Sequence, residues 1–224
     1  MLPRVLEPEV MDSLDEARDY DSMDHSRVNE IFVDDFFSLD YFHHEVLDVG
    51  VGTARIPIDL CKRRKEIRVV GIDLAASMLQ IAEVNVELAN LRERILLDRQ
   101  DAKRLTFDNH RFDAVISNSI VHHIPEPLQV LTESIRVLKP GGLLFFRDLL
   151  RPTNNLLVEQ IVKTYAADED EHARQMFEAS LRAALSLEEI LEFVTSLGFA
   201  AETVQATSDR HWTWSARREN QGPK

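Results

Sequence analysis

The chain has almost no cysteine and no long apolar run. Its only cysteine is Cys61, so an intramolecular disulfide and a cysteine-built metal site are both excluded. The longest uncharged apolar stretch, around residues 143–146, is far shorter than the roughly 18 residues of a membrane-spanning helix. The N-terminus is acidic and broken by prolines, unlike a secretory signal. We therefore expect a soluble cytoplasmic protein that does not cross a membrane.

Basic side chains are also scarce. Lys and Arg number 26 against 39 Asp and Glu, which gives a net charge of −13. Residues 1–45 account for −10 of it, with thirteen acidic residues and three arginines. Affinity for nucleic acid rests mainly on Lys and Arg that neutralise phosphates, so a nucleic-acid partner is disfavoured. An acidic surface that merely keeps the protein in solution is the simpler interpretation, and it disfavours the same partner.

What the sequence does contain is an alternation of short apolar runs and helical segments from residue 46 onward. Runs typical of strands lie at 45–50, 67–73, 94–102, 112–119 and 143–150, and segments typical of helices lie at 54–64, 75–91 and 125–138, with a KPGG turn at 139–142. This alternation predicts a doubly wound α/β fold, in which a mainly parallel sheet carries helices on both faces.

The two ends of the chain depart from this alternation. Residues 27–37 have the spacing of a packed helix, and residues 152–185 predict two further helices. Ser186 and Glu189 have the spacing of a capping box and should begin another helix. Two strand-like segments at 199–206 and 211–216 follow, and the short turn between them predicts an antiparallel pair.

The stretch VLDVGVGTAR at 46–55 predicts a strand followed by a glycine turn. In the dinucleotide fingerprint G-x-G-x-x-G the third glycine would fall at Arg55, whose long side chain would obstruct the helix–strand contact. In the alternative acid-x-G-x-G-x-G it would fall at Ala54. We expect alanine to be tolerated there, because the first turn of a helix is right-handed. The turn therefore departs mildly from the second pattern and seriously from the first.

Two carboxylates follow the next strands. Asp73 ends the run IRVVGID and comes 21 residues after Gly52, where a carboxylate can accept both hydroxyls of a ribose. It can also cap the following helix, and one residue can do both. Asp101 follows the third strand, where it can meet the exocyclic amine of an adenine, with Ala102 near the ring.

Taken together, these motifs resemble the class I S-adenosylmethionine-dependent methyltransferases. VLDVGVGTAR, GIDLAASML, RQDAKRL, FDAVISNSIVHHIPEP and RVLKPGGLLFFRD match the motifs of that family in order and spacing, over roughly residues 45–150. The resemblance implies a Rossmann-like fold of seven strands with the last antiparallel, and a helical insert after strand five. It also implies an enzyme of the small-molecule branch, which uses S-adenosylmethionine and releases S-adenosylhomocysteine.

The resemblance also implies which residues contact the cofactor. The glycine turn would follow its methionine part, Asp73 its ribose, and Asp101 its adenine. A tyrosine in the segment before the sheet would lie near its carboxylate. The cofactor-binding residues expected in this way are Tyr20, Met23, Asp48, Gly50, Gly52, Thr53, Asp73, Leu74, Met78, Asp101, Ala102, Asn118, Ser119 and His123.

Methyl transfer from a sulfonium is an in-line displacement, so the protein mainly positions the acceptor. A general base is needed only where the acceptor loses a proton. The candidates for catalysis are His122, His123 and Asp148, and the candidates for substrate binding are Tyr20, His25, Arg147 and Arg151. The histidines also fit a helix cap, and the arginines also fit ion pairs with the helical insert. No pair of histidines has the i, i+4 spacing of a helical metal site, so no metal is expected.

We expect a single domain over 1–224, divided by role. Residues 1–45 form an N-terminal helical cover, 46–150 the cofactor-binding core, 151–185 a helical insert that covers the substrate, and 186–224 a final helix and strand pair. The predicted function is methyl transfer to a small-molecule acceptor. A methyltransferase acting on protein or RNA and a non-methylating S-adenosylmethionine-binding protein are the alternatives. A dehydrogenase is disfavoured by Arg55, and the acceptor and the oligomeric state are not determined by the sequence.

Overall fold

The computed structural model describes residues 2–7, 13–23, 25–39 and 44–219. These residues form two compact units. The core unit comprises the described residues within Val10–Asn118, Gln129–Phe145 and Ala216–Lys224. The insert unit comprises those within Met1–Glu9, Ser119–Leu128 and Phe146–Ser215.

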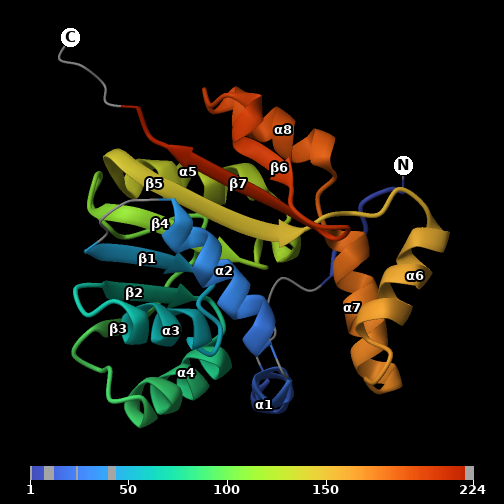
Figure 1. Cartoon of the computed structure of the whole chain (residues 1–224), viewed down its shortest axis with the longest axis horizontal. Coiled ribbons are helices and arrows are strands. Elements are labelled where there is room, and N and C mark those ends of the chain that lie inside the picture. Colours follow the sequence, from blue (N-terminus) through green and yellow to red (C-terminus); the bar gives the residue numbers. More distant parts are fainter. Residues whose placement is uncertain (1, 8–12, 24, 40–43, 220–224) are drawn as a thin grey trace. The chain divides into compact units, whose positions relative to one another are not determined.

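The strands form one seven-stranded sheet in the order β3-β2-β1-β4-β5-β7-β6 (Figure 1). The strands are β1 (Glu45–Val49), β2 (Arg68–Asp73), β3 (Ile95–Arg99), β4 (Phe112–Asn118), β5 (Leu138–Leu149), β6 (Val204–Ala206) and β7 (His211–Arg217). Strand β1 pairs in parallel with β2 and β4, and β2 pairs in parallel with β3. Strand β6 pairs antiparallel with β7. The predicted α/β class, the mainly parallel sheet and the antiparallel last strand are confirmed.

Helices flank the sheet in the core unit. They are α1 (Leu14–Ser22), α2 (Ser26–Ser38), α3 (Arg55–Arg63), α4 (Ala76–Leu88) and most of α5 (Pro127–Val137). Their buried faces meet the strands in a core that includes Phe32 and Phe36 of α2, Leu60 of α3 and Ala82 of α4. Phe32 and Phe145 of β5 lie with ring centroids 4.9 Å apart. The packed helix predicted for residues 27–37 is therefore α2, and its apolar residues Phe32, Val33 and Phe36 are the buried ones.

The insert unit is mainly helical. It contains the short 3-10 helix η1 (Val121–His123), α6 (Asn155–Tyr165), α7 (Glu171–Ala183), α8 (Leu187–Ser196) and a second 3-10 helix, η2 (Ala201–Thr203). The side chains of Asn154, Asp170 and Ser186 cap α6, α7 and α8 in turn. Ser186 and Glu189 form the capping box that their spacing predicts. The two helices predicted within 152–185 are confirmed as α6 and α7.

Two local predictions are wrong. The KPGG segment is not a turn, because β5 begins at Leu138 and runs through it. Gly142 fits there because a Cβ would lie 2.8 Å from the backbone oxygen of Asp113, and Gly141 donates its N–H to Arg218. The strand predicted at 199–206 is shorter than expected, because η2 occupies 201–203 and only Val204–Ala206 pairs with β7.

Candidate active site

The glycine turn between β1 and α3 is folded back against the end of β2. The backbone N–H groups of Gly50 and Val51 both donate to the carbonyl oxygen of Ile72. The carboxylate of Asp73 accepts one N–H from Gly52 and one from Ala75, each at 2.9 Å. Asp73 therefore ties the turn to the segment that leads into α4. The helix-capping alternative for this residue is wrong, because the N-cap of α4 is Ala75 and that helix has no side-chain cap hydrogen bond.

Ala54 differs from its expected conformation. The residue is fully buried, and its backbone is left-handed with φ of 63° and ψ of 25°. The prediction that alanine fits because this position is right-handed is therefore wrong. A glycine would adopt this conformation without strain, whereas an L-residue in it costs roughly 1–2 kcal/mol. The missing third glycine has an energetic cost that the sequence pattern alone did not indicate.

A cavity of about 490 Å³ lies beside the turn within the core unit. Its walls come from α1, the start of α2, the glycine turn, α3 and the end of β4. The predicted site residues that line it are Tyr20, Met23, His25, Asp48, Gly50, Gly52, Thr53 and Asn118. Helix α1 closes over the turn, and the ring of Tyr20 would lie 3.9 Å from a Cβ at Gly52. The structure thus brings residues from three separate sequence segments to one cavity.

Five predicted cofactor residues of the core unit, including Asp73, lie outside this lining. Met78 is buried on α4, where it packs with Ala17 of α1 and with Tyr20. Leu74 and Asp101 follow β2 and β3, and Ala102 follows Asp101. The carboxylate of Asp101 accepts the N–H of Lys103 at 2.9 Å. The roles of Leu74, Met78, Asp101 and Ala102 toward the adenine remain predictions.

Three polar residues that the sequence analysis did not select hold α1 in place. Asp21 of α1 receives two hydrogen bonds from the Arg55 guanidinium, at 3.0 and 2.6 Å. The side-chain amide of Asn85 bonds both Asp21 and the carbonyl oxygen of Thr53. Partial burial raises the pKa of Asp21, but the hydrogen bonds from Arg55, Thr53 and Asn85 outweigh burial and lower it. Arg55, which seemed only an obstruction in the sequence, anchors the cover of the cavity.

The cavity concentrates negative charge. Burial, followed by the charge of Asp73, raises the pKa of Asp48 well above its ordinary value. Burial and the carboxylates of Asp73, Asp21 and Asp48 raise the pKa of Tyr20. Burial is the larger cause in both cases, and the neighbouring carboxylates add a contribution that opposes further negative charge. A ligand with a positive centre is therefore favoured over an anion.

A second group of titratable residues lies in the insert unit. His122 on η1 and Asp148 near the end of β5 are both buried, and His122 Nδ1 lies 2.6 Å from Asp148 Oδ1. Asp148 also accepts the backbone N–H groups of Val121 and Leu149. Burial lowers the pKa of His122, but the charges of Asp148 and Glu7 outweigh burial and raise it. Burial raises the pKa of Asp148, and the contact with His122 more than reverses that effect.

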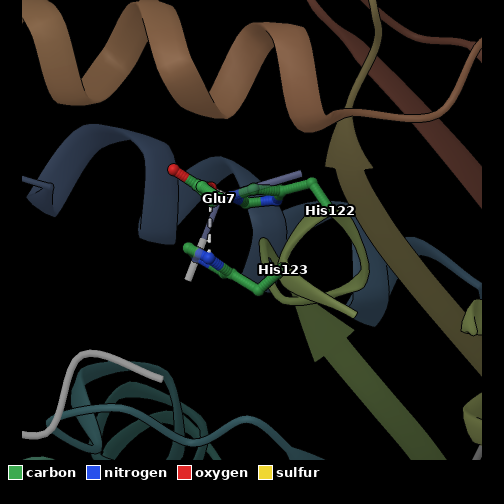
Figure 2. Close-up of side chains that lie close together, drawn as sticks. All are labelled: Glu7, His122 and His123. Atoms are coloured by element: carbon green, nitrogen blue, oxygen red, sulfur yellow. Dashed lines mark ion pairs between the residues drawn. The ribbon is translucent and has the colours of Figure 1, made fainter. Parts of the chain in front are cut away.

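Glu7 completes this group, as Figure 2 shows. Its Oε1 lies 3.1 Å from His123 Nδ1 and 3.6 Å from His122 Nε2. The two imidazole rings lie side by side with centroids 4.1 Å apart. Burial raises the pKa of Glu7, but the two histidines lower it further than burial raises it. Sequence reasoning missed Glu7, because more than a hundred residues separate it from the histidines and no local pattern marks it.

The remaining predicted residues of the insert unit are bonded within it. Arg147 is buried and donates from Nε to the hydroxyl of Thr213 on β7. Arg151 is buried and donates to the carbonyl oxygen of Ala184 and to the carboxylate of Glu189 on α8. Ser119 has a left-handed backbone with φ of 61°. These contacts are intramolecular, so substrate binding by Arg147 and Arg151 remains a prediction.

Comparisons with known proteins identify the class. Residues 47–146 match the methyltransferase-domain family. The chain is 30% identical over 166 residues to a demethylmenaquinone methyltransferase of Porphyromonas gingivalis, covering 70% of this chain and 68% of that protein. It is 33% identical to a ubiquinone biosynthesis O-methyltransferase of Coxiella burnetii, covering 47% of this chain and 44% of that protein.

A crystal structure from Methanococcus maripaludis, classed as an S-adenosyl-L-methionine-dependent methyltransferase, has the same fold. Its TM-score is 0.76 at 17% identity, with 97% of this chain and 99% of that chain covered. The chain therefore belongs to the class I S-adenosylmethionine-dependent methyltransferases. It is an enzyme with S-adenosylmethionine as its cofactor, and the two relatives described above are named for small-molecule substrates. Among the described residues, none of the helices combines the length and the apolar character needed to cross a bilayer.

Proposed function

We propose that the cavity of the core unit binds S-adenosylmethionine and that the enzyme transfers its methyl group to a small-molecule acceptor. The observation that carries this proposal is the hydrogen bond that Gly52, a residue of the cavity lining, donates to the carboxylate of Asp73. In this arrangement the methionine part follows Gly50, Gly52 and Thr53, and the ribose lies against Asp73. The adenine extends toward Leu74, Met78, Asp101 and Ala102, and Asn118 faces the sulfonium.

Asp73 retains the capacity for a ribose. Each of its carboxylate oxygens accepts one backbone N–H, and a carboxylate oxygen has a second lone pair that can accept another hydrogen bond. A ribose hydroxyl could therefore share the Asp73 carboxylate with the backbone of the turn. The carboxylate is fixed in orientation before the ligand arrives, which reduces the entropy lost on binding.

The electrostatics of the cavity support the same ligand. S-adenosylmethionine carries a sulfonium and an ammonium, and the buried carboxyl of Asp48 lies in the lining with Tyr20. A cation placed beside Asp48 would favour the ionised form of that carboxyl and reverse the effect of burial. The product, S-adenosylhomocysteine, lacks the sulfonium charge. We therefore infer that this wall distinguishes the cofactor from its product.

The acceptor is a small molecule in this proposal, and His122, His123 and Asp148 are the residues that act on it. Tyr20, His25, Arg147 and Arg151 are its proposed contacts. Support comes from the net charge of −13, which disfavours RNA, and from the quinone-related names of the two relatives. The chain also lacks the N-P-P-[YF] sequence after β4 that serves amide or base nitrogens in related enzymes, so those acceptors are disfavoured.

The first test is a calorimetric titration with S-adenosylmethionine and, separately, with NAD. We expect saturable binding of S-adenosylmethionine alone. Asp73→Ala should weaken it at least about tenfold, since a hydrogen bond to a charged group contributes about 1.5–3 kcal/mol. Asp98→Ala is the matched control, because Asp98 is an exposed carboxylate on the neighbouring strand, opposite Ile72. Binding of NAD, or equal affinity in the two variants, would contradict the proposal.

The second test measures S-adenosylhomocysteine formed in the presence of pooled small molecules, of cell protein and of RNA. We expect turnover only with the small molecules. Turnover with protein or RNA would show instead that the enzyme methylates a macromolecule. Tight binding of the cofactor without turnover in any pool would identify a non-methylating binding protein.

A further inference from the structure

Three potential metal ligands converge in the insert unit. Oε1 of Glu7, Nε2 of His122 and Nδ1 of His123 belong to a group whose ligand atoms lie within 4.8 Å of one another. Two of these atoms, Glu7 Oε1 and His123 Nδ1, are buried and lie 3.1 Å apart as an ion pair, but neither makes a hydrogen bond of good geometry within the described residues. Buried polar atoms are nearly always hydrogen-bonded, so two buried ligand atoms that face each other without a hydrogen bond point to a cation that both could bind.

We propose that Glu7, His122 and His123 bind one divalent transition-metal ion, with Zn²⁺ as the best match. Two imidazoles and one carboxylate are a ligand set that suits Zn²⁺, and such sites leave one position open. Ligand atoms about 2.0–2.1 Å from a tetrahedral ion lie about 3.3 Å from one another. The distances of 3.1 and 3.6 Å from Glu7 Oε1 to the two imidazole nitrogens fall on either side of that value.

Asp148 orients one of the ligands. A carboxylate accepts hydrogen bonds, so the 2.6 Å contact with Asp148 Oδ1 assigns a proton to Nδ1 of His122. The lone pair of a neutral His122 then lies on Nε2 and faces Glu7. This carboxylate–histidine arrangement is the usual outer shell of metal-binding histidines. In that neutral form Nε2 and Glu7 Oε1 are two electron-rich atoms that face each other at 3.6 Å, and a metal cation bound to both would remove their repulsion.

Arg4 fixes the segment that supplies the carboxylate. Its guanidinium donates to the carbonyl oxygens of His122 at 3.1 Å, Ile124 at 2.9 Å and Ala183 at 2.6 Å. The N-terminal segment is therefore locked to η1 three residues before Glu7. Ligands held in this way do not need to be gathered by the ion, which favours binding.

The experiment uses the full chain without an affinity tag, freed of metal by a chelator. Calorimetry with Zn²⁺ and visible spectroscopy with Co²⁺ in its place measure binding and coordination. We expect about one equivalent of Zn²⁺, and Co²⁺ d–d bands of low-coordinate geometry. Glu7→Gln and His123→Asn should each weaken binding at least about tenfold, because even outer-shell changes cost 10- to 100-fold. His172→Asn is the control, since His172 is exposed on α7 and outside the cluster.

Thermal unfolding adds a second readout, because an ion that binds the folded state raises the unfolding midpoint, by more when its dissociation constant is lower. Zn²⁺ should raise the midpoint of the wild type and of His172→Asn but not that of Glu7→Gln. The absence of saturable Zn²⁺ binding, or equal binding in all variants, would overturn the proposal. If Zn²⁺ does not bind, a proton on Nε2 of His122 accounts for its contact with Glu7. Nitrogen NMR would then show a doubly protonated His122. Neither cofactor nor acceptor is needed, so the result is independent of the S-adenosylmethionine titration.

Discussion

The carboxylate of Asp73 holds the backbone N–H of Gly52 at 2.9 Å, across 21 residues of sequence. The same carboxylate bonds the N–H of Ala75. A single side chain at the end of β2 therefore sets the shape of the glycine turn after β1. It serves the stability of the protein before any ligand is present.

Removal of this carboxylate should destabilise the protein without cofactor. Asp73→Ala leaves the N–H groups of Gly52 and Ala75 without their acceptor, which we expect to cost about 1–3 kcal/mol of unfolding free energy. Relief of the repulsion with Asp48 offsets part of that loss. Asp73→Asn keeps one side-chain oxygen and should lose about half as much. Urea unfolding measures both, and Asp98→Ala should stay within about 0.5 kcal/mol of the wild type. Equal stability of Asp73→Ala and Asp98→Ala would contradict this role.

Because the backbone of Ala54 is left-handed, replacing this residue by glycine should change the stability of the protein very little. Ala82 is as fully buried as Ala54 but lies inside helix α4. Ala82→Gly should cost about 1–2 kcal/mol, from the helix propensity of glycine and the lost methyl group. At Ala54 the relief of about 1–2 kcal/mol of backbone strain cancels that loss. Ala54→Gly should therefore be close to neutral. Chemical denaturation of the two variants measures the difference, and equal losses would refute the strain.

The single cysteine should be unreactive in the folded protein. Cys61 is fully buried in α3, and its Sγ lies 3.6 Å from the carbonyl oxygen of Ile67. Burial raises the pKa of its thiol from 9.0 to about 11, only partly opposed by the charge of Arg94. The thiolate fraction at pH 8 is therefore about a hundredfold lower than for an unperturbed thiol. A thiol reagent should label Cys61 only after unfolding. Rapid labelling of the native protein, at the rate seen in denaturant, would show that the helix opens.

His211 should make the protein sensitive to mild acid. Burial, followed by the charge of Arg210, lowers the pKa of His211 from 6.5 to about 4. The unfolded chain binds a proton at this residue between about pH 6.5 and pH 4 and the folded chain does not, so stability falls as the pH falls through that window. We expect His211 to account for a loss on the order of 2 kcal/mol. His211→Gln should reduce the slope of unfolding free energy against pH between 6.5 and 4. An unchanged slope would mean that other groups cause the acid sensitivity.

The sequence predicted features that depend on local spacing. The capping box of Ser186 and Glu189 spans three residues, and the helices at 155–165 and 171–183 follow from apolar periodicity. Asp73 was also found from its spacing, because parallel strands bring their carboxyl ends to one edge of a sheet. Predictions of this kind need no knowledge of distant partners.

The features that sequence reasoning missed depend on contacts between distant segments or on backbone conformation. Glu7 joins the histidines only through the fold, and Asp21 meets Arg55 across 34 residues. The backbone of Ala54 is left-handed although its side chain favours right-handed conformations. The KPGG segment has the composition of a turn, but pairing of Gly141 with Arg218 keeps it in β5. In each case a tertiary contact or a neighbouring turn outweighed local preference.

The contacts of Arg4 affect the order in which parts of the protein can fold during synthesis. Its guanidinium bonds the carbonyl oxygen of Ala183, 179 residues later in the chain. Because a ribosome synthesises the chain from its N-terminus, Arg4 emerges long before Ala183. The Arg4–Ala183 hydrogen bond cannot form until most of the chain has been made. The glycine turn closes over 21 residues and is ready much earlier. On a translating ribosome the contact between Arg4 and Ala183 therefore forms long after the glycine turn.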